Sequence, residues 1–178
     1  MIKRMIKLSL MAGLLLLIVI MHLGMAYMLP YPWNSINILF VCSILFLVFK
    51  ESGLVIWLTC AMHFFIELYS VQPFGIALVA STFSLLFTYW LYQHIFTNHS
   101  WYAVIALSII SLILYRGISL ILLFIFSMFI HTIDLQLSSL MIQYAWEILS
   151  TTLVASIIYG IPYILVFKKK QPKRALFI

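Results

Sequence analysis

The fold is decided by residues 101–130, which read WYAVIALSIISLILYRGISLILLFIFSMFI. Among these thirty residues only Arg116 is charged. A membrane-spanning helix needs about 20 consecutive apolar residues, so this run is long enough to cross a bilayer as one long, tilted helix. It could also form two short helices that break at Arg116-Gly117. Both alternatives place the segment in lipid.

The composition extends this interpretation to the whole chain. Only four of the 178 residues are acidic, charged residues make up 8%, and hydrophobic residues make up 66%. The mean hydropathy is +1.19. A soluble domain could not cover its surface with so few polar side chains. We therefore predict an all-α polytopic membrane protein, with residues 1–178 forming a single transmembrane domain of about six helices.

Turn-forming residues separate the predicted spans. The segment Leu29-Pro-Tyr-Pro-Trp33 ends the first span, because proline lacks the amide hydrogen that a helix needs. Lys50-Glu51-Ser52 and residues 70–73 form the next two turns. We predict an interfacial helix or an extended turn over residues 131–143. The predicted spans are residues 8–28, 35–49, 53–69, 74–92, 101–130 and 144–167.

Basic residues gather at the two ends of the chain. Residues 1–7 contain three Lys or Arg residues and residues 168–178 contain five, which accounts for most of the net charge of +6. With six spans, both ends and Lys50 lie on one side of the membrane. The connections on the other side contain no Lys or Arg; they are residues 29–34, 70–73 and 131–143. This distribution predicts that both termini are short, basic and cytoplasmic, and it favours contact with lipid headgroups over nucleic acid.

Arg116 is the most unusual ionisable residue because it lies deep within an apolar run. An unpaired guanidinium there would cost at least about 2.5–3.5 kcal/mol on insertion scales, so it must find water, headgroups or a carboxylate. Glu67 and Glu147 are the candidate carboxylates, and we expect a structural ion pair with one of them. The alternative is a ligand anchor, since Arg geometry suits substrate carboxylates.

Three further residues complete the set of expected intramembrane polar positions. His63 lies one turn before Glu67 on the same predicted helix face. Glu67 is predicted near the end of its helix, as an acid in headgroup water, as a structural residue or as a cation-binding residue. Glu147 is predicted at the start of the last span, where the helix dipole favours an acid.

Signatures of catalysis and metal binding are absent from the sequence. There is no GxSxG, no glycine-rich phosphate loop, no paired-carboxylate signature and no HExxH. The two cysteines, Cys42 and Cys60, form neither a CxxC pattern nor a disulfide framework. We therefore predict no catalytic residue, no metal site, no cofactor and no enzymatic activity.

One local pattern points to a family. Residues 60–78 read CAMHFFIELYSVQPFGIAL, in which an apolar helix ends in Glu67 and a turn leads into Pro73-Phe-Gly75. This pattern resembles the rod-shape-determining protein MreD family, in which a helix ends in an acid followed by leucine and a small turn, and a glycine opens the next helix. Glu67 stands where that family usually has Asp, and the family's preceding glycines are not matched well. The length, the six spans, the early Pro-rich turn and the basic tail extend the resemblance more loosely.

The resemblance implies a six-helix inner-membrane protein without catalytic activity that acts in cell-shape and cell-wall elongation assembly. Its implied partners are an MreC-like single-span scaffold protein and, through it, the actin-like MreB and the wall-synthesis machinery. A groove between helices would receive a partner's transmembrane segment. That fold is similar to the substrate-binding (S) subunits of energy-coupling-factor vitamin transporters, which are the alternative function. Their Ala-x-x-x-Ala pattern in the first helix is not matched, because Ala12 is followed at i+4 by Leu16.

The two functions predict different cavities. A protein that binds partner helices should have an apolar groove and no enclosed polar cavity. A vitamin-binding subunit should have a pocket on the outer side, capped by loops, with Arg116, Trp33, Trp57 and Trp146 in its lining.

Overall fold

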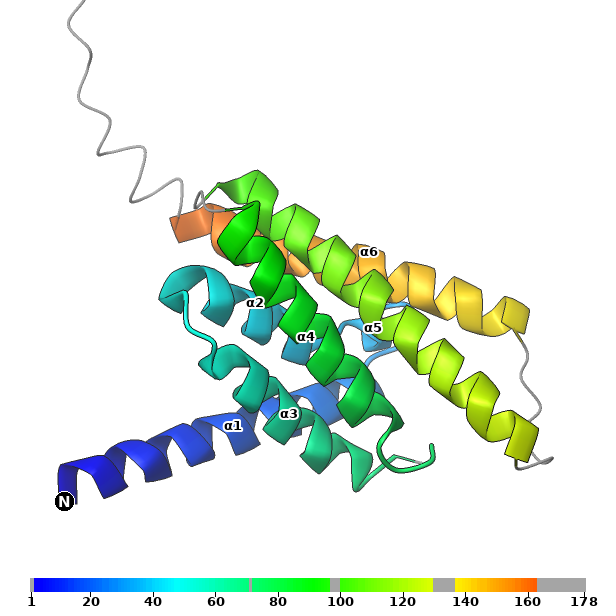
Figure 1. Cartoon of the computed structure of the whole chain (residues 1–178), viewed down its shortest axis with the longest axis horizontal. Helices are drawn as coiled ribbons and strands as arrows, with labels where there is room; N and C mark the ends of the chain where they lie inside the picture. The colour runs from blue at the N-terminus through cyan, green and yellow to red at the C-terminus, as the bar shows by residue number, and fades with distance from the viewer. Residues whose placement is uncertain (1, 71, 97–99, 130–136, 163–178) are drawn as a thin grey trace, which may run out of the picture.

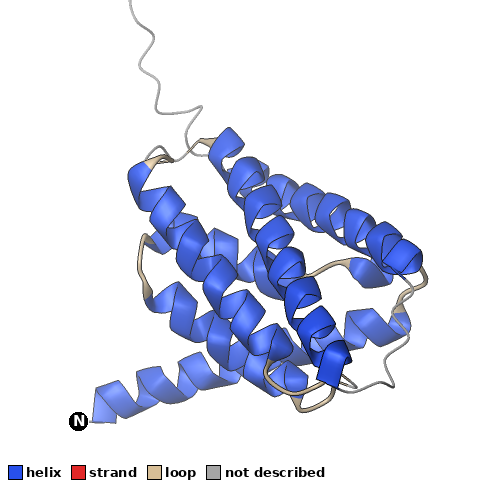
Figure 2. Ribbon diagram, turned by 45° about the vertical axis from the view of Figure 1, so that its right-hand side comes forward, coloured by secondary structure: helices blue, strands red, loops and turns tan. Residues whose placement is uncertain are grey.

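The computed structural model describes residues 2–70, 72–96, 100–129 and 137–162. Within these ranges the chain forms six α-helices and one short 3-10 helix, with no strand, which confirms the all-α prediction (Figures 1 and 2). The helices are α1 (Ile2–Met28), η1 (Trp33–Ser35), α2 (Ile38–Lys50), α3 (Leu54–Glu67), α4 (Ile76–His94), α5 (Trp101–Phe129) and α6 (Leu137–Pro162). The predicted basic tail and residues 131–136 lie outside the described residues.

The long apolar run that opened the sequence forms one helix. The helix α5 continues without a break through Arg116-Gly117, so the alternative of two short helices is wrong. A glycine inside a helix costs only about 1 kcal/mol relative to alanine, and a Cβ added at Gly117 would meet no atom within 4 Å. The helix is therefore continuous because nothing at this position is costly enough to break it.

Four of the six helices are long and apolar enough to cross a membrane. These segments are Ser9–Met28, Ile76–His94, Trp101–Met128 and Ser138–Ile161. The two others, α2 with 13 residues and α3 with 14, are each about 20 Å long at about 1.5 Å per residue. The hydrocarbon core of a bilayer is about 30 Å thick, so neither helix matches a full span. The segments predicted as spans over 35–49 and 53–69 are thus helical, as α2 and α3, but they form a short helical hairpin.

The helix α2 is short but central. It contacts α1, α3, α5 and α6, and it contributes the fully buried side chains of Phe40, Ile44 and Leu47 to the main hydrophobic core. Val104 and Leu107 of α5 belong to the same cluster. The sequence of α2 is almost entirely apolar, as expected for a helix that packs against four neighbours.

The helix α1 is the least integrated part of the fold. Figures 1 and 2 show its N-terminal half projecting away from the other five helices. Further along, Val19 is buried in a small second cluster with Leu39 of α2 and Met62 of α3. The helix begins at Ile2, so the predicted basic end over residues 1–7 belongs largely to α1.

Candidate functional site

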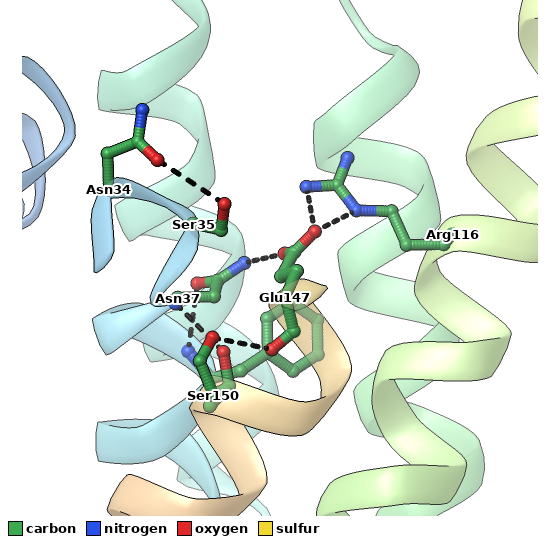
Figure 3. A network of polar contacts seen from close by, with 8 residues as sticks. Asn34, Ser35, Asn37, Arg116, Glu147 and Ser150 are labelled. Atoms are coloured by element: carbon green, nitrogen blue, oxygen red, sulfur yellow. Dashed lines mark hydrogen bonds and ion pairs between the residues drawn. The ribbon is translucent and has the colours of Figure 1, made fainter. Parts of the chain in front are cut away.

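Arg116 of α5 and Glu147 of α6 form an ion pair between two neighbouring helices. The guanidinium donates from Nε and from Nη2 to the same carboxylate oxygen, Oε2, at 2.6 Å and 2.5 Å (Figure 3). The predicted ion pair therefore forms with Glu147, whereas Glu67 binds elsewhere. The helix α6 begins at Leu137, before the predicted start of the last span, so Glu147 lies inside the helix and not at its N-terminus. This inward position brings the carboxylate level with Arg116.

Asn37 is the other hydrogen-bond partner of the Glu147 carboxylate, and the sequence analysis did not identify it. Its side-chain nitrogen Nδ2 donates to Glu147 Oε1 at 2.9 Å, while its backbone N–H donates to Thr151 Oγ1 at 2.9 Å. Its Oδ1 also accepts from the backbone N–H of Phe40, which caps the N-terminus of α2. An Asn directly before an apolar helical run is a recognised N-cap pattern, so the capping role could have been predicted, but not the contact with α6.

Aromatic rings hold the guanidinium in place. The guanidinium carbon of Arg116 lies 4.8 Å from the ring centre of Tyr115 and 4.5 Å from that of Tyr144. The arginine side chain is 22% exposed, whereas the Glu147 side chain is 3% exposed. The third nitrogen, Nη1, points away from Glu147 and has no hydrogen-bond partner among the described residues (Figure 3). The ion pair thus leaves one edge of the guanidinium free.

Arg116 also lines a cavity of about 220 Å³ whose lining side chains are largely polar; we call it the polar recess. The recess lies where η1, the turn after α3 and the first half of α6 meet, and α1 and α5 supply further walls. This is the end of the bundle that the charge distribution predicts to face outward. The polar side chains in its lining are His22, Asn34, Ser35, Asn37, His63, Ser70, Gln72, Tyr115, Arg116, Gln143 and Glu147.

Two histidines face the polar recess. His63 is buried, and its Nδ1 lies 3.0 Å from the backbone carbonyl oxygen of Thr59. A carbonyl only accepts hydrogen bonds, so Nδ1 carries the hydrogen and, in the uncharged ring, Nε2 is an acceptor. The ring packs against Phe40 and Tyr115 with 5.6 Å between ring centres in each case. The Nδ1 atom of His22 is buried and has no hydrogen-bond partner among the described residues.

Glu67 is buried and its carboxylate binds backbone N–H groups, which favours the predicted structural role over an acid in headgroup water. Its Oε2 accepts the backbone N–H of Gly75 and its Oε1 accepts that of Leu78, both at 2.9 Å. The carboxylate therefore caps the N-terminus of α4 from the end of α3. Pro73 and Gly75, the expected turn motif, lie in this connection, and Gly75 has a φ of 99°. The contacts of Glu67 are thus structural. His63, one turn before it, instead binds the backbone carbonyl of Thr59.

A second hollow lies among α1, α2 and α3 and is almost entirely apolar; we call it the apolar groove. Its volume is about 100 Å³. Met11 and Leu14, in the N-terminal half of α1, form part of its lining. Its lining residues are Met11, Leu14, Leu15, Ile18, Cys42, Ser43, Phe46, Val55, Leu58 and Met62.

The expected tryptophans do not join the polar recess. Trp33, Trp57 and Trp146 are exposed, and none of them is in its lining. Trp146 instead packs edge-on against Tyr31, with 6.4 Å between ring centres. Among the described residues, no group of three His, Cys, Asp or Glu side chains is placed to hold a metal ion. No family model, no curated protein and no solved structure is a match for this chain.

Proposed function

We propose that the chain is a non-catalytic membrane protein that binds the transmembrane segment of a partner. The observation that supports this proposal is the apolar groove together with the projecting half of α1. Leu14 and Ile18 of α1 form one wall of the groove, and Phe46 and Leu58 lie on the opposite walls. A helix placed in this wedge would pack against three helices at once, and close packing drives helix association in lipid.

The partner follows from the sequence resemblance to the MreD family. The proposed partner is an MreC-like single-span scaffold, and the proposed process is cell-shape and cell-wall elongation assembly in the inner membrane. The proposed topology keeps both termini cytoplasmic. Four crossings and six crossings are both even numbers, so the short hairpin formed by α2 and α3 does not alter this arrangement.

A second candidate function has one observation in its favour. The polar recess lies at the predicted outer end and includes Arg116, as expected for the substrate-binding subunit of an energy-coupling-factor transporter. The three expected tryptophans are missing from its lining, and the apolar groove has no part in that function. We therefore rank partner binding first.

Site-specific photo-cross-linking in native membranes tests the proposal. A photoreactive amino acid replaces Leu14, which lines the apolar groove, or Leu16, which lies on the opposite side of the same helix. The two side chains are 56% and 44% exposed, so lipid reaches both. We expect a discrete adduct with a single-span protein from position 14 and none from position 16.

Other products of the same experiment would contradict the proposal. Equal labelling at positions 14 and 16, or labelling of lipid alone at both, removes the case for a partner in the apolar groove. Co-purification of ATPases with a coupling subunit supports the second candidate instead.

A further inference from the structure

We infer that the polar recess binds a small monocarboxylic acid, whose carboxylate meets the free edge of Arg116. The inference concerns a different part of the molecule from the apolar groove, and it needs neither a partner protein nor a transporter. It is carried by the hydrogen-bond partners around the recess, by its charge and by its size.

The acids at or near the recess already have donors for both oxygens. Glu147 accepts from Arg116 at one oxygen and from Asn37 at the other. Glu67 accepts two backbone N–H groups. By contrast, Nη1 of Arg116 has no partner among the described residues. The recess therefore contains one charged donor, Nη1 of Arg116, whose charge no described carboxylate contacts at that atom, and a ligand carboxylate would suit it.

The Arg116 side chain is already held in place before a second acceptor binds. The ion pair and the rings of Tyr115 and Tyr144 already fix the guanidinium, so little side-chain freedom is lost when a ligand binds. A guanidinium presents paired N–H groups in a fork that matches a carboxylate. The edge opposite Glu147 can thus accept a ligand carboxylate without rearrangement.

The charge and volume of the recess limit the class of acid. Glu147 neutralises part of the Arg116 charge, and no Lys or second Arg is in the lining, which favours one carboxylate over a phosphate or a dicarboxylate. At about 220 Å³ the recess has room for several water molecules or for a small acid. Tyr115 and His63 offer ring surfaces for the rest of such a molecule.

The test compares acids with their matched amides on the full chain in lipid nanodiscs. The probes are straight-chain monocarboxylates of two to eight carbons and benzoate, each paired with its primary amide, and binding is measured by equilibrium dialysis and by thermal shift. We expect saturable binding of at least one acid and none of its amide. The variant E147Q removes the competing negative charge, so the acid should bind about tenfold more tightly.

A neutral double variant provides the decisive control. R116Q/E147Q retains hydrogen-bonding groups on both helices without a buried charge, and it should abolish acid binding. E51Q, which changes an acid outside the lining of the polar recess, should leave it unchanged. Circular dichroism and size-exclusion profiles establish that each variant is folded.

Three results would overturn the inference. The first is equal binding of an acid and its amide, and the second is acid binding that survives in R116Q/E147Q. The third is that no acid binds saturably to either the wild type or E147Q. The cross-linking at position 14 is unaffected by any of these results, so failure of this inference and failure of the proposed function remain separate.

Discussion

The Glu67 carboxylate, at the last residue of α3, binds the backbone N–H of Gly75, immediately before the first residue of α4. The other oxygen binds the backbone N–H of Leu78. One side chain therefore satisfies two of the N–H groups that a helix leaves without partners at its N-terminus. This contact ties the end of α3 to the start of α4.

Removing the Glu67 carboxylate should destabilise the fold. Glu67→Ala leaves two partly buried N–H groups without their acceptors, at a cost of about 2–4 kcal/mol in the free energy of unfolding. Glu67→Gln keeps one oxygen acceptor and should lose about half as much. Thermal unfolding in detergent, followed by circular dichroism, measures both variants. An E67A protein as stable as the wild type would show that the cap has no energetic role.

Two glycines should respond in opposite ways to the same substitution. Gly75 has a φ of 99°, so Gly75→Ala forces a left-handed backbone on alanine and should cost about 1–2 kcal/mol. Gly117 is inside α5 with no atom within 4 Å of an added Cβ, so Gly117→Ala should stabilise by up to about 1 kcal/mol. The two melting temperatures should move in opposite directions, and a shift in the same direction would contradict the assigned backbone conformations.

Replacing one member of the ion pair between α5 and α6 should lower the stability of the fold more than replacing both members. Arg116→Leu leaves the Glu147 charge buried and should cost about 3–5 kcal/mol, seen as a low folded yield. The double variant R116L/E147L carries no buried charge and should recover most of this loss. Yield and monodispersity by size exclusion provide the measurement. If the single variant is tolerated as well as the double, then water or headgroups satisfy Glu147 instead.

Asn37 should be more sensitive than its neighbour Asn34. Asn37→Ala removes the cap of α2 and a donor to Glu147, which should cost about 2–3 kcal/mol in total. Asn34 is exposed and its side chain accepts only a long contact from Ser35, so Asn34→Ala should change stability by less than about 0.5 kcal/mol. Urea or thermal unfolding of the two variants side by side checks the difference, and equal effects would argue against a role for Asn37 in joining α2 to α6.

Filling the apolar groove should impair partner binding and leave the fold intact. Leu14→Trp places a large ring in the groove, whereas Leu16→Trp places the same ring on the opposite side of α1. Both variants should unfold at the wild-type temperature, because both positions are exposed. Co-purification of the cross-linked partner should fall at least about fivefold for the first variant only, which corresponds to about 1 kcal/mol of binding energy. A similar loss for both would place the contact elsewhere.

The sequence predicted those features that depend on local chemistry. The Pro-rich segment at 30–32 separates α1 from α2 as expected, and the turns at Lys50-Glu51 and at 70–73 lie where they were placed. The need of Arg116 for a carboxylate also followed from the cost of an unpaired charge in lipid. These predictions succeeded because each rests on one or a few adjacent residues.

Features that depend on how helices pack could not be predicted in the same way. The choice of Glu147 over Glu67 depends on the start of α6 at Leu137, in a stretch whose mixed polarity resembles a surface turn. The contact of Asn37 with Glu147 joins residues 110 positions apart. The polar recess is built from side chains of several helices and turns, so no window of sequence contains its pattern.

The shortness of α3 would affect the lipids beside it. This helix exposes Trp57 and Phe64 and is about 10 Å shorter than an average hydrocarbon layer, so in a bilayer the neighbouring acyl chains would compress or the polar surface would dip inward. Such a mismatch costs a fraction of a kcal/mol for every ångström, which is enough to bias where a protein resides. A membrane protein with one short lipid-facing helix is expected to concentrate in the thinner regions of a bilayer. Proteins with similarly short spans are expected to associate with it on that side.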